Sequence, residues 1–270
     1  MVFRSLKLHG QALVAALQFL TRLPIPLQVP FEPAALARSV IYFPAAGTVV
    51  GVAVASACGL LDLFMPSLPA AVIIVAIWAA MSGGLHLDGW MDTADGVLSH
   101  RSRERMLEIM KDSRVGAMGV IAAVLLLLFK FAVIAELFQH RDGMSATALS
   151  ALAAIPLWSR WWMSVAIVGW PSARQGEGVG ALFQKAGIRQ AIAGFALTIA
   201  LTCISLWTFG MPIGHSALWS AGAASLTALI GSVMAAWLCR KLGGLTGDTY
   251  GALNEMIEAS LLLALLLALN

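Results

Sequence analysis

Residues 117–138 read AMGVIAAVLLLLFKFAVIAELF, an apolar run that contains only two charged side chains. An α-helix rises about 1.5 Å per residue, so about 20 such residues cross the roughly 30 Å hydrocarbon core of a bilayer. The whole chain has the same character, with 60% hydrophobic and 11% charged residues, whereas soluble domains carry about 25% charged residues. The sequence therefore predicts an all-α integral membrane protein.

Further apolar segments predict a polytopic transmembrane helical bundle of about seven spans. We place the spans near residues 39–61, 68–85, 117–138, 146–169, 190–209, 216–238 and 255–269. The last of these is short, so we expect it to be tilted or incomplete. The run at 12–20 is also short and is followed by a Pro-containing segment, so we expect an interfacial helix lying on the membrane. No internal repeat divides residues 1–270, and we expect a single membrane domain.

The basic residues predict the orientation of these spans. With the N-terminus in the cytoplasm, all 17 lysines and arginines fall on the cytoplasmic side except Arg141, outside, and Lys130 and Arg160, within spans. Such asymmetry is the positive-inside pattern of membrane proteins. It also accounts for the net charge of +3, which in this context does not indicate nucleic acid. Lys130 is expected to pair or to reach the membrane surface.

Residues 83–96 read GGLHLDGWMDTADG and hold the most informative polar pattern. Asp88, Asp92 and Asp95 stand at positions i, i+4 and i+7, which share one face of a helix. Three such carboxylates repel one another unless a cation lies between them, and hard oxygen ligands favour Mg²⁺ or Mn²⁺ holding a phosphate. The simpler alternative is a solvated acidic helix end. His86 faces elsewhere, which favours a supporting or structural role.

A basic segment follows at 101–116, RSRERMLEIMKDSRVG, directly before the span at 117–138. Lys111, Ser113 and Arg114 offer two cations and a hydroxyl beside a helix N-terminus, which favours phosphate binding. For the arginines at 101, 103 and 105 we favour the alternative that they face anionic lipid.

A second polar segment lies at 243–258, GGLTGDTYGALNEMIE. Asp248 could cap a helix, bind metal or act as a base. Asn254 and Glu255 point into the start of the last span, where a carboxylate is costly and so suggests function. Glu258 could instead pair helices or reach the surface. In the predicted topology this segment and the aspartates open on the same face and could share one site. Arg160 could reach the surface or a substrate phosphate.

Four segments together resemble the cobalamin synthase family, the adenosylcobinamide-GDP ribazoletransferases. They are FLTRLP at 19–24, GLHLDG at 84–89 with DTADG at 92–96, MKDSRVG at 110–116 and GLTGDTYG at 244–251. The resemblance runs nearly end to end. It implies that adenosylcobinamide-GDP is joined to α-ribazole or its 5′-phosphate, giving adenosylcobalamin or its 5′-phosphate, and GMP. It also implies Mg²⁺ as cofactor. With the predicted topology, we expect a multi-pass protein of the bacterial cytoplasmic (inner) membrane, with its active site on the cytoplasmic face. A homo-oligomer is compatible with the sequence.

The expected roles follow from the motifs and this resemblance. Asp88, Asp92 and Asp95 hold metal, Lys111 and Arg114 stabilise charge during catalysis, and Asp95 or Asp248 accepts a proton. Substrate binding is expected of Lys111, Ser113, Arg114, Arg160, Asp248, Asn254 and Glu255.

Two other functions agree less well with the sequence. CDP-alcohol phosphotransferases also use aspartates at a membrane face, but their D-G-x2-A-R pattern is absent, because Met91-Asp92 stands where Ala-Arg is required. A transporter is disfavoured because the acids gather at helix ends beside glycines.

Overall fold

The structure is a computed structural model that describes residues 2–29, 33–140, 144–174, 182–183 and 185–269. Within these ranges the chain is helical, and an isolated β-bridge joins Ser172 to Leu245. The elements are α1 (Val2–Leu20), α2 (Pro33–Ser39), the 3-10 helix η1 (Val40–Tyr42), α3 (Phe43–Asp62), α4 (Ser67–Ser82), α5 (Leu85–Val97), α6 (Arg103–Ile109), α7 (Ala117–Gln139), α8 (Ala146–Gly169), α9 (Ile188–Thr208), α10 (Ile213–Leu242) and α11 (Gly247–Leu269).

The predicted helical membrane bundle is confirmed. In the described part of the chain, six helical segments are long and apolar enough to cross a bilayer: 34–62, α7, α8, α9, 214–242 and α11. The bent pair of α4 and α5 raises the number to as many as seven. The expectation of a short last span was wrong, because α11 begins at Gly247 and has 23 residues. The first turns of α11 contain residues of the polar segment at 243–258, most of which lies before the predicted span at 255–269.

Helix α8 lies at the centre of the bundle, and most of its side chains are buried. Helix α3 packs on it through Gly47 and Gly51, where an added Cβ would overlap the backbone of Pro156 and Ala153. Small residues allow helices in a membrane to approach closely, because packing rather than hydrophobicity drives their association. This pair therefore forms a rigid core against which the other helices are placed.

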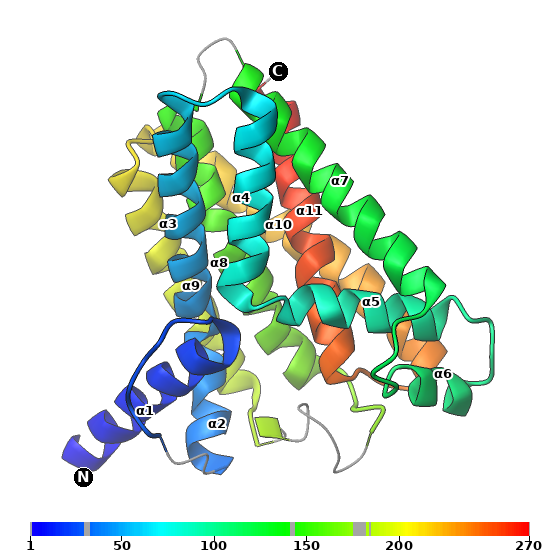
Figure 1. Ribbon diagram of the computed structural model, residues 1–270. Coiled ribbons are helices and arrows are strands. Elements are labelled where there is room, and N and C mark those ends of the chain that lie inside the picture. Colours follow the sequence, from blue (N-terminus) through cyan, green and yellow to red (C-terminus); the bar gives the residue numbers. More distant parts are fainter. Residues whose placement is uncertain (1, 30–32, 141–143, 175–181, 184, 270) are drawn as a thin grey trace.

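The chain turns sharply between α4 and α5. Gly83 and Gly84 have φ values of +63° and +74°, in the left-handed region that favours glycine. The turn sets α5 at 89° to α4, so α5 lies across one end of the bundle instead of continuing through it (Figure 1). The side chain of Arg22 packs against Gly83, and its backbone N–H donates to the carbonyl of Met81 at 2.8 Å.

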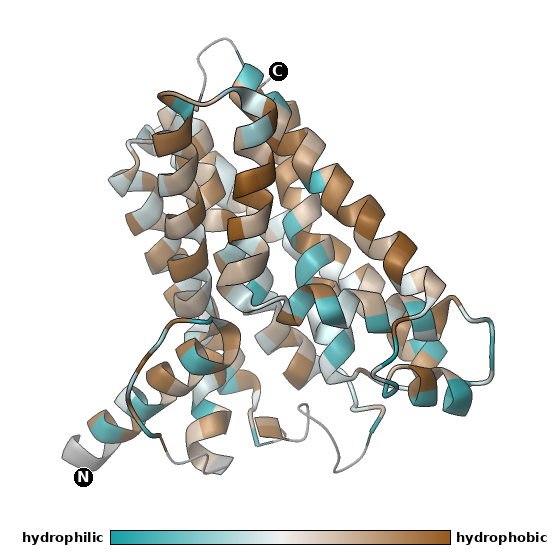
Figure 2. Ribbon diagram, in the orientation of Figure 1, coloured by the Kyte–Doolittle hydropathy of each residue, from teal (hydrophilic) through white to brown (hydrophobic). Residues whose placement is uncertain are grey.

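One end of the bundle collects the polar parts of the molecule. Helices α1, α5 and α6 lie there, together with the segments that lead out of α8 and into α11 (Figure 1). Hydrophilic residues concentrate at this end, while the upper bundle is mostly hydrophobic (Figure 2). Both polar segments of the sequence are therefore at the same end, as one shared site requires. The helical nature of 12–20 is confirmed within α1, and its location at the membrane surface stays a prediction.

Candidate active site

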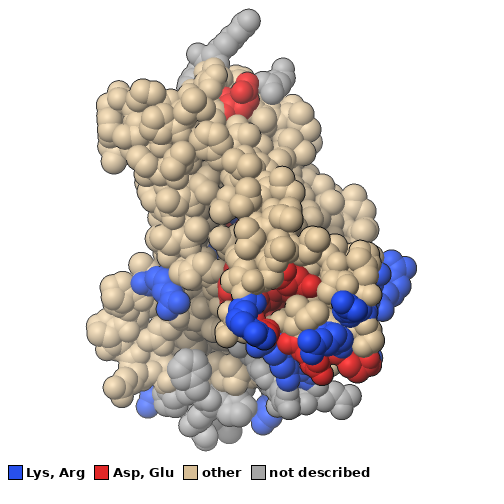
Figure 3. Space-filling model, turned by 45° about the vertical axis from the view of Figure 1, so that its right-hand side comes forward, with Lys and Arg blue, Asp and Glu red and all other residues tan. Residues whose placement is uncertain are grey.

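Helix α5 presents its three aspartates on one side. The predicted helix is present at Leu85–Val97, so Asp88, Asp92 and Asp95 share a face as their spacing indicates. Asp88 is exposed, while Asp92 and Asp95 are half-buried. Acidic side chains flanked by basic ones gather in this region of the surface (Figure 3).

The first turn of α11 packs directly on α5. A Cβ added to Gly89 would lie 2.6 Å from the backbone oxygen of Asp248, and one added to Gly251 would lie 3.1 Å from that of His86. The two helices are therefore as close as glycine allows. This contact brings the second polar segment against the aspartate helix, although the two are far apart in the sequence.

Asp248 is held in place by two donors. Arg174 Nη1 lies 3.2 Å from Asp248 Oδ2, and the hydroxyl of Thr246 donates to the same oxygen at 3.3 Å. Arg174 also donates through Nη2 to the carbonyl of Leu107 at 3.2 Å, which ties α6 to the site.

The sequence predicts Arg174 only as one of the basic residues on the cytoplasmic side, and not its contact with Asp248. The contact arises because the segment after α8 pairs with the segment before α11. The N–H of Ala173 donates to Leu245 O at 2.9 Å, and the N–H of Leu245 donates to Pro171 O at 2.8 Å. No local pattern predicts a pairing between segments so far apart.

Asp92 is the acid most affected by its surroundings. Helix α5 is bent away from the spanning direction and lies outside the six helices that could cross a bilayer. Burial, followed by the charges of Asp88, Asp248 and Asp95, raises the pKa of Asp92 to about 7. Near neutral pH a cation bound beside Asp92 would therefore favour the ionised form of this carboxylate.

This donor set fits a divalent cation in its chemistry. Carboxylate oxygens are the ligands of Mg²⁺, which keeps several waters and needs only one or two protein carboxylates alongside substrate phosphates. Among the described residues, no three His, Cys, Asp or Glu side chains are already placed around a common point. The three-aspartate assignment stays a prediction.

Asp95 has a second, structural task. Its Oδ2 accepts the N–H of Gly116 at 2.8 Å, and its Oδ1 accepts the N–H of Gly119 at 2.7 Å. Both N–H groups belong to the N-terminus of α7, where the first N–H groups of a helix have no partner within the helix. Asp95 thus fastens the aspartate helix to the segment that carries Lys111, Ser113 and Arg114.

The basic segment lies beside this contact. A cavity of about 490 Å³ is lined by Asp95, Asp112 and Arg114 together with the start of α7. Arg114 donates to the carboxylate of Asp112 through Nε and through Nη2, the latter at 2.6 Å. These hydrogen bonds lower the pKa of Asp112 to about 2. Lys111, Ser113 and Arg114 are exposed, as phosphate-binding groups must be.

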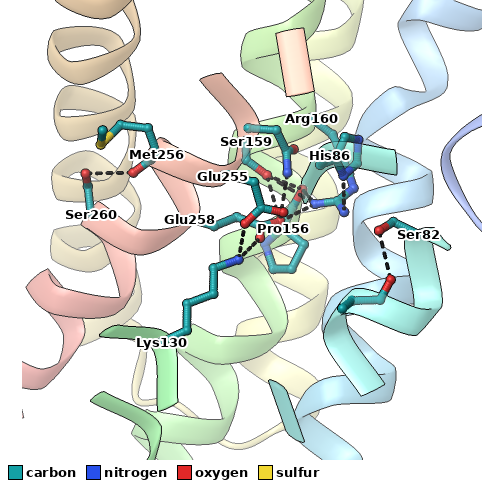
Figure 4. A network of polar contacts seen from close by, with 12 residues as sticks. Ser82, His86, Lys130, Pro156, Ser159, Arg160, Glu255, Met256, Glu258 and Ser260 are labelled. Carbon is teal, nitrogen blue, oxygen red and sulfur yellow. Dashed lines mark hydrogen bonds and ion pairs between the residues drawn. The ribbon is translucent and has the colours of Figure 1, made fainter. Parts of the chain in front are cut away.

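The other predicted substrate residues occupy a different place. Arg160 and Asn254 are 1% and 0% exposed, and Glu255 is 7% exposed. Arg160 and Glu255 lie in a buried polar network inside the bundle (Figure 4), and Asn254 donates to Glu258 of this network at 3.3 Å. Their substrate-binding role stays a prediction, and this structure places them behind the site.

Lys130 belongs to this network. Its Nζ lies 2.5 Å from Glu255 Oε2 and 2.9 Å from Glu258 Oε2. Of the two expectations for Lys130, pairing is confirmed, and extension to the membrane surface is wrong because the side chain is enclosed. Arg160 is likewise enclosed, with Nη1 2.5 Å from Glu258 Oε1.

Comparisons with known proteins identify the relatives of this chain. The family model described as cobalamin-5-phosphate synthase matches residues 12–266. An adenosylcobinamide-GDP ribazoletransferase of Desulforamulus reducens is 39% identical, over 98% of this chain and 97% of the relative. Proteins of the same name from Roseiflexus sp. and Brevibacillus brevis are 38% and 39% identical, each over 94% of this chain and over 88% and 97% of their own length. No solved structure matches the chain.

Proposed function

This chain belongs to the cobalamin-5-phosphate synthase family, and we propose that it joins adenosylcobinamide-GDP to α-ribazole or α-ribazole 5′-phosphate with Mg²⁺ as cofactor. Membership makes it a transferase of phosphate-containing groups in cobalamin biosynthesis, carried by a multi-pass helical membrane protein. The observation that best supports the proposed chemistry is the meeting of α5 and α11, which gathers acids from two distant motifs beside a basic segment.

The proposed reaction exchanges the phosphoanhydride bond of a diphosphate for a new phosphate ester. A ribose hydroxyl of ribazole attacks the phosphorus attached to the cobinamide arm, so that a new O–P bond forms. The P–O bond to the GMP part of the diphosphate breaks, and GMP leaves with the bonding electrons. The hydroxyl proton passes to a carboxylate of the protein, giving adenosylcobalamin or its 5′-phosphate.

The acidic face of α5 would hold the cation. We assign this role to Asp88 and Asp92, with Asp95 contributing while it keeps its contacts to the N-terminus of α7. When bound, Mg²⁺ supplies neutralisation of the diphosphate charge and of the departing phosphate. Without the charge of the cation the aspartates would repel the diphosphate, so they would hold it beside α5 and Asp248 only with the cation bound.

Lys111, Ser113 and Arg114 would complete the phosphate contacts. Arg114 is already paired with Asp112, so a phosphate oxygen replaces one charged acceptor with another. Because this pair is exposed, it is weak, and the exchange costs little. A guanidinium then offers two parallel donors to the leaving phosphate.

Asp248 is the proton acceptor that we favour over Asp95. Both oxygens of Asp95 accept backbone N–H groups at the start of α7, so a proton could be received there only at the expense of one of these hydrogen bonds. The contacts of Asp248 with Arg174 and Thr246, in the described part of the chain, both involve Oδ2. Oδ1 would then take the proton, while Arg174 keeps the carboxylate oriented.

We further propose that residues 1–270 act as one domain of the bacterial cytoplasmic membrane, with this site facing the cytoplasm. The placement rests on the basic residues that surround the site end of the bundle. A corrinoid substrate and ribazole would then meet at the membrane surface.

The test is turnover by the purified protein. With adenosylcobinamide-GDP, α-ribazole and Mg²⁺, we expect one GMP for each adenosylcobalamin formed. Asp248→Asn keeps the shape of the side chain, and we expect it to lower the rate by about a hundredfold or more while the corrinoid still binds. Asp62→Asn is a matched control, because Asp62 accepts the N–H of Met144 outside the site.

The outcomes separate the possible roles of Asp248. If Asp248 were only a helix cap, Asn would serve about as well as Asp, and turnover would be unchanged. If it were a metal ligand, high Mg²⁺ would restore part of the rate. Absence of GMP release from correctly folded protein would refute the proposed function itself.

A further inference from the structure

Side chains from four helices form ion pairs and hydrogen bonds inside the bundle, behind the site. Glu258 of α11 accepts from Lys130 of α7 at 2.9 Å and from Arg160 of α8 at 2.5 Å. Arg160 reaches on with Nη2 to Nδ1 of His86 on α5, at 3.4 Å. With Glu255, which pairs with Lys130 at 2.5 Å, these five residues form what we term the buried relay (Figure 4).

The relay is balanced in charge and shielded from solvent. Two cations face two carboxylates, and each of the five residues is between 0% and 7% exposed. Because Arg160 can only donate, Nδ1 of His86 must accept, and the ring proton lies on Nε2. Buried charges are costly unless they are paired, so the ion pairs constrain the positions of the side chains that form them. In the described part of the chain, Nε2 of His86 and Nε of Arg160 have no hydrogen-bond partner, so the contact with Nδ1 is what ties His86 to this group.

Stability alone does not explain such a group. Buried ion pairs can often be replaced by apolar residues of similar volume at no cost, although removing one partner is strongly destabilising. Unlike an apolar core, the relay can fix how the helices are oriented, because hydrogen bonds to charged groups have defined distances and angles. The helix it fixes through His86 is the one that carries the aspartates.

We propose that the buried relay positions α5 on α11, with His86, Arg160 and Glu258 acting as positioning residues for the catalytic acids. The inference rests on the proposed function, since it concerns the geometry of that site. His86 lies two residues before Asp88 and on the buried side of α5, and its backbone oxygen adjoins Gly251. Glu258 lies on the same helix as Asp248. The relay therefore links the two acid-bearing helices from the side opposite to the substrate.

The relay has two halves that allow a matched comparison. The double variant Arg160→Met/Glu258→Met removes one cation and one carboxylate. It also removes the contact between Arg160 and His86, which joins α5 to the relay. The double variant Lys130→Met/Glu255→Met removes the same charges but leaves Arg160 bound to Glu258 and His86. Both remain neutral overall, so neither leaves an unpaired buried charge.

We expect the first double variant to lose at least about tenfold in kcat, the scale of a displacement of a fraction of an ångström, with KM for adenosylcobinamide-GDP little changed. The second should lose clearly less in kcat than the first, because Arg160 stays bound to Glu258 and His86. Thermal unfolding of both variants, and their Mn²⁺ affinity measured by electron paramagnetic resonance of the free ion, provide readouts besides turnover. Weaker Mn²⁺ binding only in the first variant, at equal thermal stability, supports positioning.

Two single substitutions of His86 complete the test. His86→Asn retains an acceptor near the position of Nδ1 and should keep more of the rate than His86→Leu, which has none. Equal kcat losses in the two double variants, or equal rates in His86→Asn and His86→Leu, would overturn the proposal. In either case a wild-type protein that still releases GMP would leave the proposed function intact, so the two can fail separately.

Discussion

Substitution of Gly89 by alanine is the most direct perturbation of the contact between α5 and α11. The new Cβ would lie 2.6 Å from the backbone oxygen of Asp248, whereas ordinary van der Waals contact begins at 3.4 Å. The two helices must therefore separate by about 0.8 Å, because neither backbone can rotate away as a flexible side chain would. A misplacement of about 1 Å in a catalytic site can cost about a hundredfold in rate, and we expect a loss of roughly that size in kcat.

The assay is GMP release by purified protein, with thermal unfolding measured on the same preparation. Overpacking of this kind costs about 1–3 kcal/mol of stability, so the variant should still fold. Gly222→Ala is the control, since no atom lies within 4 Å of its added Cβ. Gly251→Ala, at 3.1 Å from the His86 oxygen, should give an intermediate loss. A folded Gly89→Ala protein with the wild-type rate would refute the argument that α5 and α11 form one site.

Three further predictions follow from the acids and from the charge distribution. Asp88→Asn and Asp92→Asn should each lower turnover by about a hundredfold without lowering the melting temperature, because repulsion between the carboxylates is relieved; near-normal rates in both would remove the metal assignment. Because the pKa of Asp92 is raised to about 7, its protonated form predominates below that pH, so Mn²⁺ affinity should rise as pH increases through 7 and level off above it. An affinity that is constant between about pH 5.5 and pH 8.5 would contradict this. A cysteine placed at Ser102 should react only with reagents that enter the cytoplasm, and one at Ser67 only from outside; the reverse labelling would overturn the predicted topology.

The fold was largely predictable because membrane helices carry their own signal. Apolar length set the spans, and the i, i+4, i+7 spacing of Asp88, Asp92 and Asp95 set the helical character of α5. The early start of α11 at Gly247 was missed, because glycines and acids in its first turns hide a helix from hydropathy. The 89° turn at Gly83 and Gly84 was also missed, since the spacing of apolar residues does not report an angle.

The sequence predicts which residues to consider for the candidate site, but not which partners they contact. Asp95 has the same sequence signal as Asp92, yet its role at the start of α7 depends on a contact between helices. Arg174 appeared only as one loop cation, and its position beside Asp248 depends on the pairing of two loops. The sequence alone leaves Arg160 between the membrane surface and a substrate, because charge in a span indicates importance without identifying the partner.

The rate of the double variant Asp92→Asn/Asp248→Asn, compared with both single variants, tests the central claim most directly. Groups that act as one catalytic unit have strongly non-additive effects. If α5 and α11 build one site, the double variant should lose little more activity than the slower single variant. A loss equal to the product of the two single losses would contradict the account, because it would mean that Asp92 and Asp248 act independently.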